Sequence, residues 1–364
     1  MSTGKTVLIY RIGSLGDTVV ALPCLHLIAR IFPESKRILL TNTPVHAKAP
    51  AASAVLGDSG LVHNYLSYPI GTRNLFQLAK LWWKIRQLKV GTVVNLSPIR
   101  GEAANRRDNL FFRLCGAKRI VGTPSGELAT YLYDSQADRY EAEASRLARC
   151  IAELGDARLK DLASWDLVLT AQEKSRAAAA LRPLYGRAFF TLGIASKQQV
   201  TDWGVSNWKQ FMPQLSKKFP EHALVFIGAK EDRADVEEVA AQWPGTFLNL
   251  CGELAPRESA AVIKQGEAYL GLDSGPMHLA ASVGTPCVSI SAANKLPGMW
   301  FPFGDTHEVI YHKTECFGCN LQVCTMEKKR CILTITPEEV VTATVRAVSR
   351  IAQSGSPQPA EQIS

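Results

Sequence analysis

Short runs of apolar and β-branched residues alternate along the chain with longer segments whose apolar positions recur every three or four residues. In the first half, "TVLIY" (6–10), "RILLTN" (37–42) and "TVVNLS" (92–97) have the strand pattern, and "LFQLAKLWWKIRQLK" (75–89) has the helical one. Strands that alternate with helices predict βα units around a parallel sheet. The sequence therefore predicts an α/β fold.

A second series of the same kind begins with "AFFTLGIAS" (188–196) and continues through "ALVFIGA" (223–229) and "AYLGLDSG" (268–275). We expect a hinge near residues 165–187, a domain over 1–170, a second over 171–350 and a mobile polar tail over 351–364. Two doubly wound domains that face each other across a cleft bind ligands at the carboxyl ends of their strands.

The chain has 364 residues, which is long enough for two hydrophobic cores. "MSTGK" leads directly into the first strand without the apolar region of a secretory signal. No apolar run reaches the roughly 18 residues that a membrane-spanning helix needs. We expect a cytoplasmic protein.

The net charge of +8 is concentrated in one segment. Residues 80–119 contain ten Lys and Arg but only two acids, Glu102 and Asp108. Such a segment suits nucleic acid, anionic lipid or a phosphorylated substrate, and an ordinary solvated surface has the same composition. Trp82 and Trp83 lie within it, and because neighbouring helix positions diverge by about 100°, we expect one of them to pack inward.

The first stretch with candidate chemistry is "RIGSLGDTVVALPCL" (11–25). Gly13 and Gly16 permit a tight turn from strand to helix. Asp17 at the helix start is by itself most simply a helix cap, but a carboxylate there is also placed to accept a proton from a hydroxyl group. The stretch has neither the GxGxxG spacing nor the P-loop lysine, so a dinucleotide or ATP-hydrolysis site is not indicated.

The second stretch is "YLGLDSGPMHLAASVGTPCVSI" (269–290), in which Asp273, Ser274 and Gly275 follow a strand and His278 lies in the first helical turn. Backbone amides at a helix N-terminus bind anions such as a diphosphate. His278 alone is more typical of a capping or surface histidine, although here it can also donate to a phosphate.

Both stretches, together with "FIGAKED" and "CILTITPEEVV", resemble glycosyltransferase family nine, the bacterial heptosyltransferases, in that family's order along the chain. The resemblance implies a GT-B fold with two Rossmann-like domains, the acceptor on the N-terminal one and the nucleotide-sugar donor on the C-terminal one. It also implies an inverting transfer that needs no metal for catalysis.

Carried over by position, Asp17 matches the family's catalytic base, and Asp273, Ser274, Gly275 and His278 match the loop that binds the donor diphosphate. Glu231 matches an acid that binds the ribose hydroxyls. The chain departs from the family before Trp203, where Thr201 and Asp202 replace an expected lysine. Lys197 is the nearest cation and is our candidate to replace it.

Four of the nine cysteines, Cys316, Cys319, Cys324 and Cys331, fall in "CFGCNLQVCTMEKKRC". This spacing is typical of metal ligands, and four thiolates favour tetrahedral zinc or iron. The alternative is a loop of reduced thiols. Cysteines of this kind also recur in the resembling family, so we expect a structural metal site and no catalytic cofactor.

The sequence favours transfer of a heptose or related sugar from an ADP-sugar to an anionic bacterial glycan such as the lipopolysaccharide core. Arg100, Arg106 and Arg107 are candidate acceptor contacts, and the basic segment also suits peripheral contact with the inner membrane. The acceptor can alternatively be a protein or a small molecule. A non-catalytic protein that binds anions or nucleic acid is the remaining alternative, although we expect no nucleic acid partner.

Overall fold

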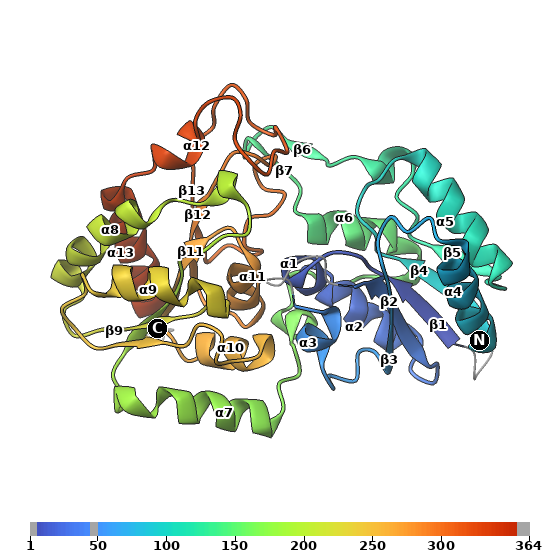
Figure 1. Cartoon of the computed structure of the whole chain (residues 1–364), viewed down its shortest axis with the longest axis horizontal. Coiled ribbons are helices and arrows are strands. Elements are labelled where there is room, and N and C mark those ends of the chain that lie inside the picture. The colour runs from blue at the N-terminus through green and yellow to red at the C-terminus, as the bar shows by residue number, and fades with distance from the viewer. Residues whose placement is uncertain (1–5, 44–49, 355–364) are drawn as a thin grey trace, which may run out of the picture. The chain divides into compact units, whose positions relative to one another are not determined.

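The computed structural model describes residues 6–43 and 50–354, which form two compact units (Figure 1). The first unit comprises Met1–Ser175, Ala255–Ala261 and Leu296–Trp300, and the second comprises Arg176–Leu254, Val262–Lys295 and Phe301–Ser364. The chain first passes between the units within helix α7 (Ala171–Leu181). Two short segments from the C-terminal half thus belong to the first unit, which the alternation of strands and helices did not predict.

The first unit is built on a parallel sheet in the order β3-β2-β1-β4-β5. Its strands are β1 (Thr6–Tyr10), β2 (Arg37–Asn42), β3 (Asn64–Tyr68), β4 (Val90–Asn95) and β5 (Arg119–Val121). All residues of β1 and β2 are buried, as is typical of central strands in a parallel sheet. A short antiparallel pair, β6 (Tyr133–Asp134) and β7 (Arg139–Tyr140), lies outside this sheet.

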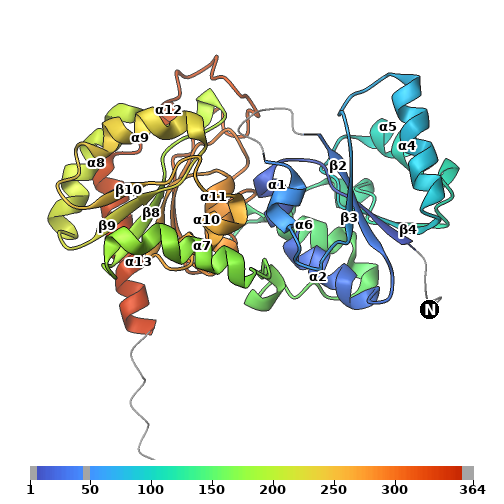
Figure 2. The same cartoon turned by 60° about the horizontal axis from the view of Figure 1, so that its bottom comes forward.

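Helices cover both faces of the first sheet (Figures 1 and 2). Leu81, Ile85 and Phe112 pack α4 and α5 against Leu8 and Tyr10 in one core. The helices of this unit are α1 (Leu15–Val19), α2 (Leu22–Ile31), α3 (Ala52–Leu56), α4 (Leu75–Gln87), α5 (Glu102–Leu114) and α6 (Glu143–Cys150), with 3-10 turns at Gly126–Ala129, Ala152–Leu154 and Leu162–Trp165.

The second unit has a parallel sheet in the order β10-β9-β8-β11-β12-β13. Its strands are β8 (Phe189–Gly193), β9 (Ala223–Phe226), β10 (Phe247–Asn249), β11 (Ala268–Leu272), β12 (Cys287–Ser291) and β13 (Glu308–Tyr311). Counted within the unit, this is the strand order 3-2-1-4-5-6 of dinucleotide-binding folds. The expected α/β class with two Rossmann-like units is therefore confirmed.

Trp203, Trp208 and Phe211 form the centre of the second core, together with apolar residues of α9 and α13. The helices are α8 (Val205–Lys218), α9 (Arg233–Ala240), α10 (Pro256–Ile263), α11 (Gly275–Ser282), α12 (Arg330–Leu333) and α13 (Pro337–Ser354), with 3-10 turns at Arg182–Leu184, Gln199–Thr201 and Lys230–Asp232. α13 extends four residues into the expected tail 351–364, and residues 355–364 lie outside the described part of the chain.

Both tryptophans of the basic segment are exposed, Trp82 by 39% and Trp83 by 57%. The expectation that one of them packs inward is therefore wrong. Trp82 instead lies on the surface, where its indole Nε1 donates to Leu114 O at 3.0 Å and the Arg86 guanidinium stacks on its ring. Within the described residues, we find no helix with the length and apolar character required to cross a bilayer.

Candidate functional site

The loop from β1 to α1 holds Asp17 in one defined position. Gly13 has φ of 140°, and a Cβ atom built there would lie 2.2 Å from Asp17 Cγ, so only glycine fits. The Gly13 N–H donates to Asn42 Oδ1 at 2.7 Å, which ties the turn to the end of the neighbouring strand β2.

The Asp17 carboxylate caps its own helix. Its Oδ2 accepts from the Ser14 N–H at 2.8 Å and from the Ser14 hydroxyl at 3.3 Å, which completes a capping box. Its Oδ1 lies 3.5 Å from Arg11 Nη2, and 23% of the side chain is exposed. A carboxylate fixed in this way stays oriented while it remains accessible to a substrate.

A buried ionic network lies behind Asp17. The Arg11 guanidinium donates to Asp17 O at 2.9 Å and to Glu143 Oε1 at 3.2 Å, and Glu143 also accepts from Arg146 at 2.7 and 2.8 Å and from the Tyr131 hydroxyl at 2.7 Å. Burial by itself raises the pKa of Glu143, but hydrogen bonds from Arg146 and the charge of Arg11 outweigh it and lower that pKa. The network fixes Arg11, and Arg11 in turn orients Asp17.

The three arginines expected to contact the acceptor differ in their surroundings. Arg100 follows β4 and stacks over Tyr10 at the end of β1, and its guanidinium pairs with Asp108. Arg107 pairs with the other oxygen of the same carboxylate at 2.9 Å, whereas Arg106 lies exposed on α5. β1 and β4 are the strands between which the strand order reverses, where such sheets bind ligands. Asp17 and Arg100 therefore follow the two strands of this switch point.

In the second unit, the residues expected to bind the donor all follow the carboxyl ends of strands of one parallel sheet. Lys197 follows β8, Glu231 follows β9, and the loop Asp273–Gly275 follows β11. The strand order reverses between β8 and β11, so this edge is the switch point of the second sheet.

Asp273 and His278 face each other across the start of α11, with Asp273 Oδ1 3.9 Å from His278 Nε2. Burial lowers the pKa of His278 to about 4. Burial also raises the pKa of Asp273 to about 7, although the charge of Lys295 acts in the opposite direction. At neutral pH the imidazole is thus uncharged, and its N–H remains a donor suited to a phosphate oxygen.

Two buried hydroxyls lie beneath the same loop. Among the described side chains, Tyr269 Oη and Ser274 Oγ are both buried without a hydrogen-bond partner of ordinary geometry. The Tyr269 hydroxyl fits there because Gly193 and Gly271 have no side chains, and a Cβ atom on them would lie 2.0 and 2.6 Å from it. A hydrogen bond with Ser274 acts on the pKa of Tyr269 against the effect of burial, so the two hydroxyls are partners of each other and do not by themselves indicate a ligand. Sequence reasoning missed Tyr269.

Glu231 and Lys197 are both exposed. The neighbour of Glu231, Asp232, supplies the local cap by accepting from the Ala229 N–H at 2.8 Å, so capping does not account for Glu231. Asp202, which stands where the resemblance predicts a lysine, lies 3.4 Å from Lys329 Nζ.

The cysteine-rich loop 316–331 packs beside this edge with four free thiols. Cys331 is buried, and its pKa is raised by burial and by the nearby thiols of Cys316, Cys324 and Cys319. A hydrogen bond of 3.1 Å from the Lys329 N–H lowers the pKa of Cys324. As placed, no three of the described His, Cys, Asp and Glu side chains form a group that could hold a metal ion.

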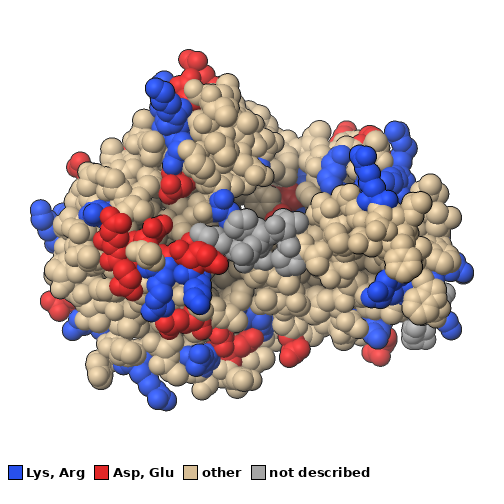
Figure 3. Space-filling model, viewed as in Figure 1, with Lys and Arg blue, Asp and Glu red and all other residues tan. Residues whose placement is uncertain are grey.

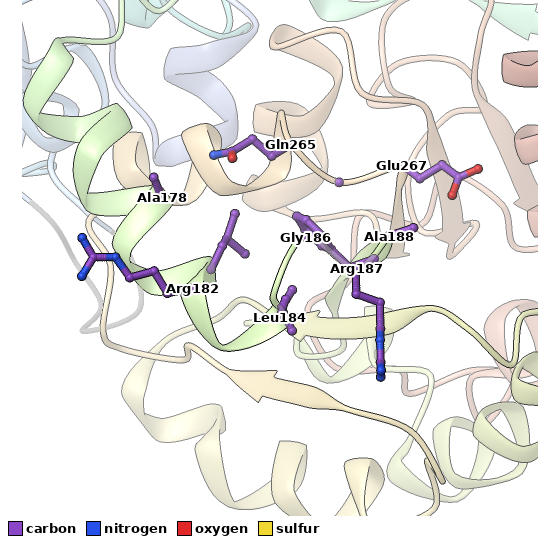
Figure 4. Close-up of a pocket in the computed structure, with 11 residues that line it drawn as sticks. Ala178, Arg182, Leu184, Gly186, Arg187, Ala188, Gln265 and Glu267 are labelled. Carbon is purple, nitrogen blue, oxygen red and sulfur yellow. The ribbon is translucent and has the colours of Figure 1, made fainter.

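A pocket of about 490 Å³ lies elsewhere on the second unit (Figure 4). It is lined by residues before and at the start of β8 and by Gln265–Glu267 before β11, which places it at the amino ends of the strands. Arg182 and Arg187 point away from each other there. This pocket contains none of the predicted site residues.

The chain matches a known protein family and a curated relative in sequence. A family model described as "Glycosyltransferase family 9 (heptosyltransferase)" matches residues 128–330, more than half of the chain. Lipopolysaccharide heptosyltransferase 3 of Escherichia coli is 28% identical over 110 residues, 30% of this chain and 32% of that protein. The chain thus matches about a third of that relative's length.

Two solved structures cover nearly the whole chain. The glycosyl transferase family 9 protein of Veillonella parvula DSM 2008 has a TM-score of 0.73 at 15% identity, covering 96% of this chain and 99% of that one. E. coli ADP-heptose lps heptosyltransferase II has a TM-score of 0.64 at 16% identity, covering 95% of this chain and 99% of that one. At these identities they show the fold alone, and they agree with the expected GT-B class.

Proposed function

Because the chain belongs to glycosyltransferase family 9, the heptosyltransferases, we propose that it transfers a heptose from ADP-heptose to a hydroxyl of an anionic bacterial glycan. The observation that carries this proposal is the Asp17 carboxylate, which is held by the Ser14 amide and Arg11 and is still 23% exposed. This is the arrangement that a general base requires.

In the proposed reaction, Asp17 takes the proton of the acceptor hydroxyl as that oxygen attacks the anomeric carbon of the donor. The new bond forms between this oxygen and the anomeric carbon, and the bond to the diphosphate oxygen breaks on the opposite face, so the configuration inverts. The nucleoside diphosphate leaves with the bonding electron pair. Hydrogen-bond donors that are already positioned around the departing diphosphate stabilise its developing negative charge and so lower the barrier to this step.

The donor binds at the carboxyl edge of the second sheet. The backbone amides of Ser274 and Gly275 and the neutral His278 supply hydrogen bonds to the diphosphate, with Asp273 packed against His278. Glu231 accepts from the ribose hydroxyls. Lys197 remains a candidate cation for the diphosphate.

A direct test measures stabilisation by ADP-, UDP-, GDP- and CDP-sugars, followed by transfer from the best donor. We expect ADP-heptose to raise the melting temperature and Asp17→Asn to lower kcat by about 10²- to 10⁴-fold, the usual contribution of a general base, with donor affinity unchanged. Asp58→Asn, the same substitution at an exposed position of the first unit, is the matched control and should leave kcat unchanged. Full activity of Asp17→Asn would exclude Asp17 as the base, and no stabilisation by any donor would exclude the donor site.

The proposed acceptor is a phosphorylated glycan such as the lipopolysaccharide core, contacted by Arg100, Arg106 and Arg107. We expect the same unit to associate peripherally with the cytoplasmic face of the inner membrane. On α4 and α5, apolar side chains are exposed between basic ones, with Leu75 81%, Phe76 78% and Leu110 62% accessible. Lys and Arg side chains gather over the part of the unit that holds α5 (Figure 3). Exposed apolar residues among cations are typical of surfaces that bind anionic lipid.

Co-sedimentation with lipid vesicles tests this association. The wild type should bind vesicles with anionic lipid several-fold better than zwitterionic ones, and Phe76→Ala should weaken that binding. Leu162→Ala removes a similarly exposed apolar side chain elsewhere in the unit and should have no effect. Equal binding to both kinds of vesicle would contradict the proposed lipid preference.

We also propose a structural zinc or iron at Cys316, Cys319, Cys324 and Cys331, with no part in the transfer step. The spacing and the mutual influence of these thiols support it, although binding would have to draw them closer together. Elemental analysis should find about one metal ion per chain, because four thiolates complete one tetrahedral site. A Cys319→Ser variant should lose it, whereas Cys115→Ser should not. Metal-free wild-type protein would refute the site.

A further inference from the structure

The proposed donor brings a doubly charged diphosphate to the second sheet, and this group gains a further negative charge as it leaves the sugar. The position before Trp203 offers it no cation. Asp202 stands there, and its carboxylate lies 3.4 Å from Lys329 Nζ. A carboxylate at this position repels an anionic ligand. Another basic side chain at the same edge is needed to balance the charge.

Lys295 lies at that edge. It follows β12, which pairs with β11 in parallel register through Leu272 and Ile290. The Asp273 N–H donates to Ile290 O at 3.2 Å, so the chain beyond β12 starts beside the donor loop. Lys295 is also the cation whose charge acts on the Asp273 carboxyl group.

The segment that carries Lys295 is held rigidly. Ala292, Ala293 and Asn294 are at most 3% exposed. The cysteine-rich loop clamps their backbone, with Gly318 N–H donating to Ala293 O at 2.7 Å and Asn320 N–H donating to Asn294 O at 2.8 Å. The backbone from which the Lys295 side chain leaves is therefore already ordered, so no loop has to be ordered when a ligand binds.

The same loop also contacts the lysine side chain. The Lys295 ammonium donates to Asn320 Oδ1, and the Tyr311 hydroxyl donates to Lys295 O at 3.2 Å. Asn320 has φ of 61°, a left-handed conformation that asparagine tolerates better than most residues. An ammonium group has three N–H donors, so the bond to Asn320 orients Lys295 and leaves donors for a phosphate.

The geometry points to Lys295 as the cation that binds the donor diphosphate beside Ser274 and Gly275, with the cysteine-rich loop positioning it through Asn320. This inference rests on the proposed function, since it assigns a residue to the same donor site. It also gives the cysteine-rich loop a role whether or not a metal is bound there.

The test compares a nucleoside diphosphate with the matching uncharged nucleoside. The nucleobase is that of the diphosphate that the wild type binds best among ADP, UDP, GDP and CDP. A hydrogen bond to a charged group contributes about 1.5–3 kcal/mol. Lys295→Met should therefore weaken binding of the nucleoside diphosphate about 10- to 150-fold and leave binding of the nucleoside unchanged. Lys264→Met, at an exposed position of the same unit, is the control and should bind both ligands normally.

Two variants of Asn320 test the positioning role. Asn320→Gly tolerates the left-handed backbone but removes the acceptor, so diphosphate binding should fall several-fold with no change for the nucleoside. Asn320→Gln keeps a neutral amide acceptor and adds no charge beside the diphosphate, so it should retain part of the binding that Asn320→Gly loses. Wild-type binding by Asn320→Gly would overturn the positioning role.

The outcomes separate this inference from the proposed function. If the wild type binds none of the four diphosphates, the proposed donor site itself is wrong. If the wild type binds one of them and Lys295→Met binds it equally well, Lys295 is not the cation. A Lys295→Met variant that loses the diphosphate and the nucleoside in equal proportion would show general damage to the site and would also overturn the assignment.

Discussion

Replacing Glu143 by glutamine should destabilise the first unit far more than an exposed Glu→Gln change. Both carboxylate oxygens of Glu143 are fully used: Oε1 accepts from Arg11 and Arg146, and Oε2 accepts from Arg146 and Tyr131. The amide nitrogen of a glutamine must therefore face two donors whichever way the side chain turns. The substitution also leaves the guanidinium groups of Arg11 and Arg146, 3% and 0% exposed, without their shared anion.

Removing one partner of a buried ion pair typically costs about 3–5 kcal/mol, because the remaining charge is left without compensation in a medium of low polarity. For a unit of this size, about 2–4 °C of melting temperature is lost per kcal/mol, so we expect a decrease of about 6–20 °C. Glu153, which pairs with Arg119 at the surface, provides the control. Glu153→Gln should change stability by less than about 1 kcal/mol.

We also expect the loss of stability in Glu143→Gln to depend on pH. The folded protein lowers the pKa of Glu143, so the stabilisation by this carboxylate is fully present above its unfolded pKa of about 4.3. It is lost as the pH falls through the lower folded value. The difference between wild type and Glu143→Gln should therefore be full at pH 7 and shrink below about pH 4.

Urea unfolding followed by circular dichroism measures both effects, and if the two units unfold separately, the loss should be confined to the transition of the first unit. A Glu143→Gln protein as stable at pH 7 as Glu153→Gln would refute the reasoning, since it would mean that the buried arginines do not need the anion.

Three further predictions concern single positions. In Gly13→Ala the new Cβ would lie 2.2 Å from Asp17 Cγ and would displace that carboxylate. Because a shift of about 1 Å in a catalytic group can cost about 100-fold, we expect the transfer rate to fall by at least that factor. Initial rates are compared with those of Gly60→Ala, whose Cβ meets nothing within 4 Å. Asp273→Asn should gain melting temperature over the wild type as the pH rises from 5 to 7 and gain little more above it. Burial raises the pKa of Asp273 to about 7 in the folded protein, against about 3.9 when unfolded, so only the wild type is destabilised as the pH rises through that range. A constant difference in scanning fluorimetry would contradict this. The buried Arg257 guanidinium donates to Leu56 O at 3.0 Å, to Leu167 O at 2.8 Å and to Glu173. Arg257→Met should therefore lower the free energy of unfolding in urea by about 3–5 kcal/mol. The surface variant Arg119→Met should leave it nearly unchanged.

The fold was predictable because its signals are local. Central parallel strands are buried on both faces, so "TVLIY" and "RILLTN" both have an apolar centre, and the alternation of such runs with helices determines the class. The capping role of Asp17 was equally local, since the cap partner Ser14 lies three residues away. The candidate donor residues follow strand ends, and parallel strands bring those ends to one edge.

What could not be predicted depends on contacts between distant parts of the chain. Arg11 meets Glu143 across 132 positions, and Arg257 reaches Leu56 O across 201, so no pattern within a helix or strand indicates either contact. Leu296–Trp300 joins the first unit through Pro297 O, which accepts from the Tyr140 N–H, and Met299 O, which accepts from the Glu143 N–H. Lys295 directly precedes that segment and was indistinguishable in sequence from any surface lysine.

These distant contacts explain why the sequence alone offered Lys197 as a candidate cation and gave no sign of Lys295. Lys197 was chosen because it is near Trp203 in sequence, but nearness along the chain does not determine which strand end a side chain approaches. Lys295 follows the strand that pairs with β11, and its side chain is held by a residue 25 positions away. In a parallel sheet, the residues that converge on a ligand come from loops separated by whole βα units. A cation for the donor loop is therefore sought after the strands that neighbour β11, which are β8 and β12, and Lys197 and Lys295 are the lysines that follow them.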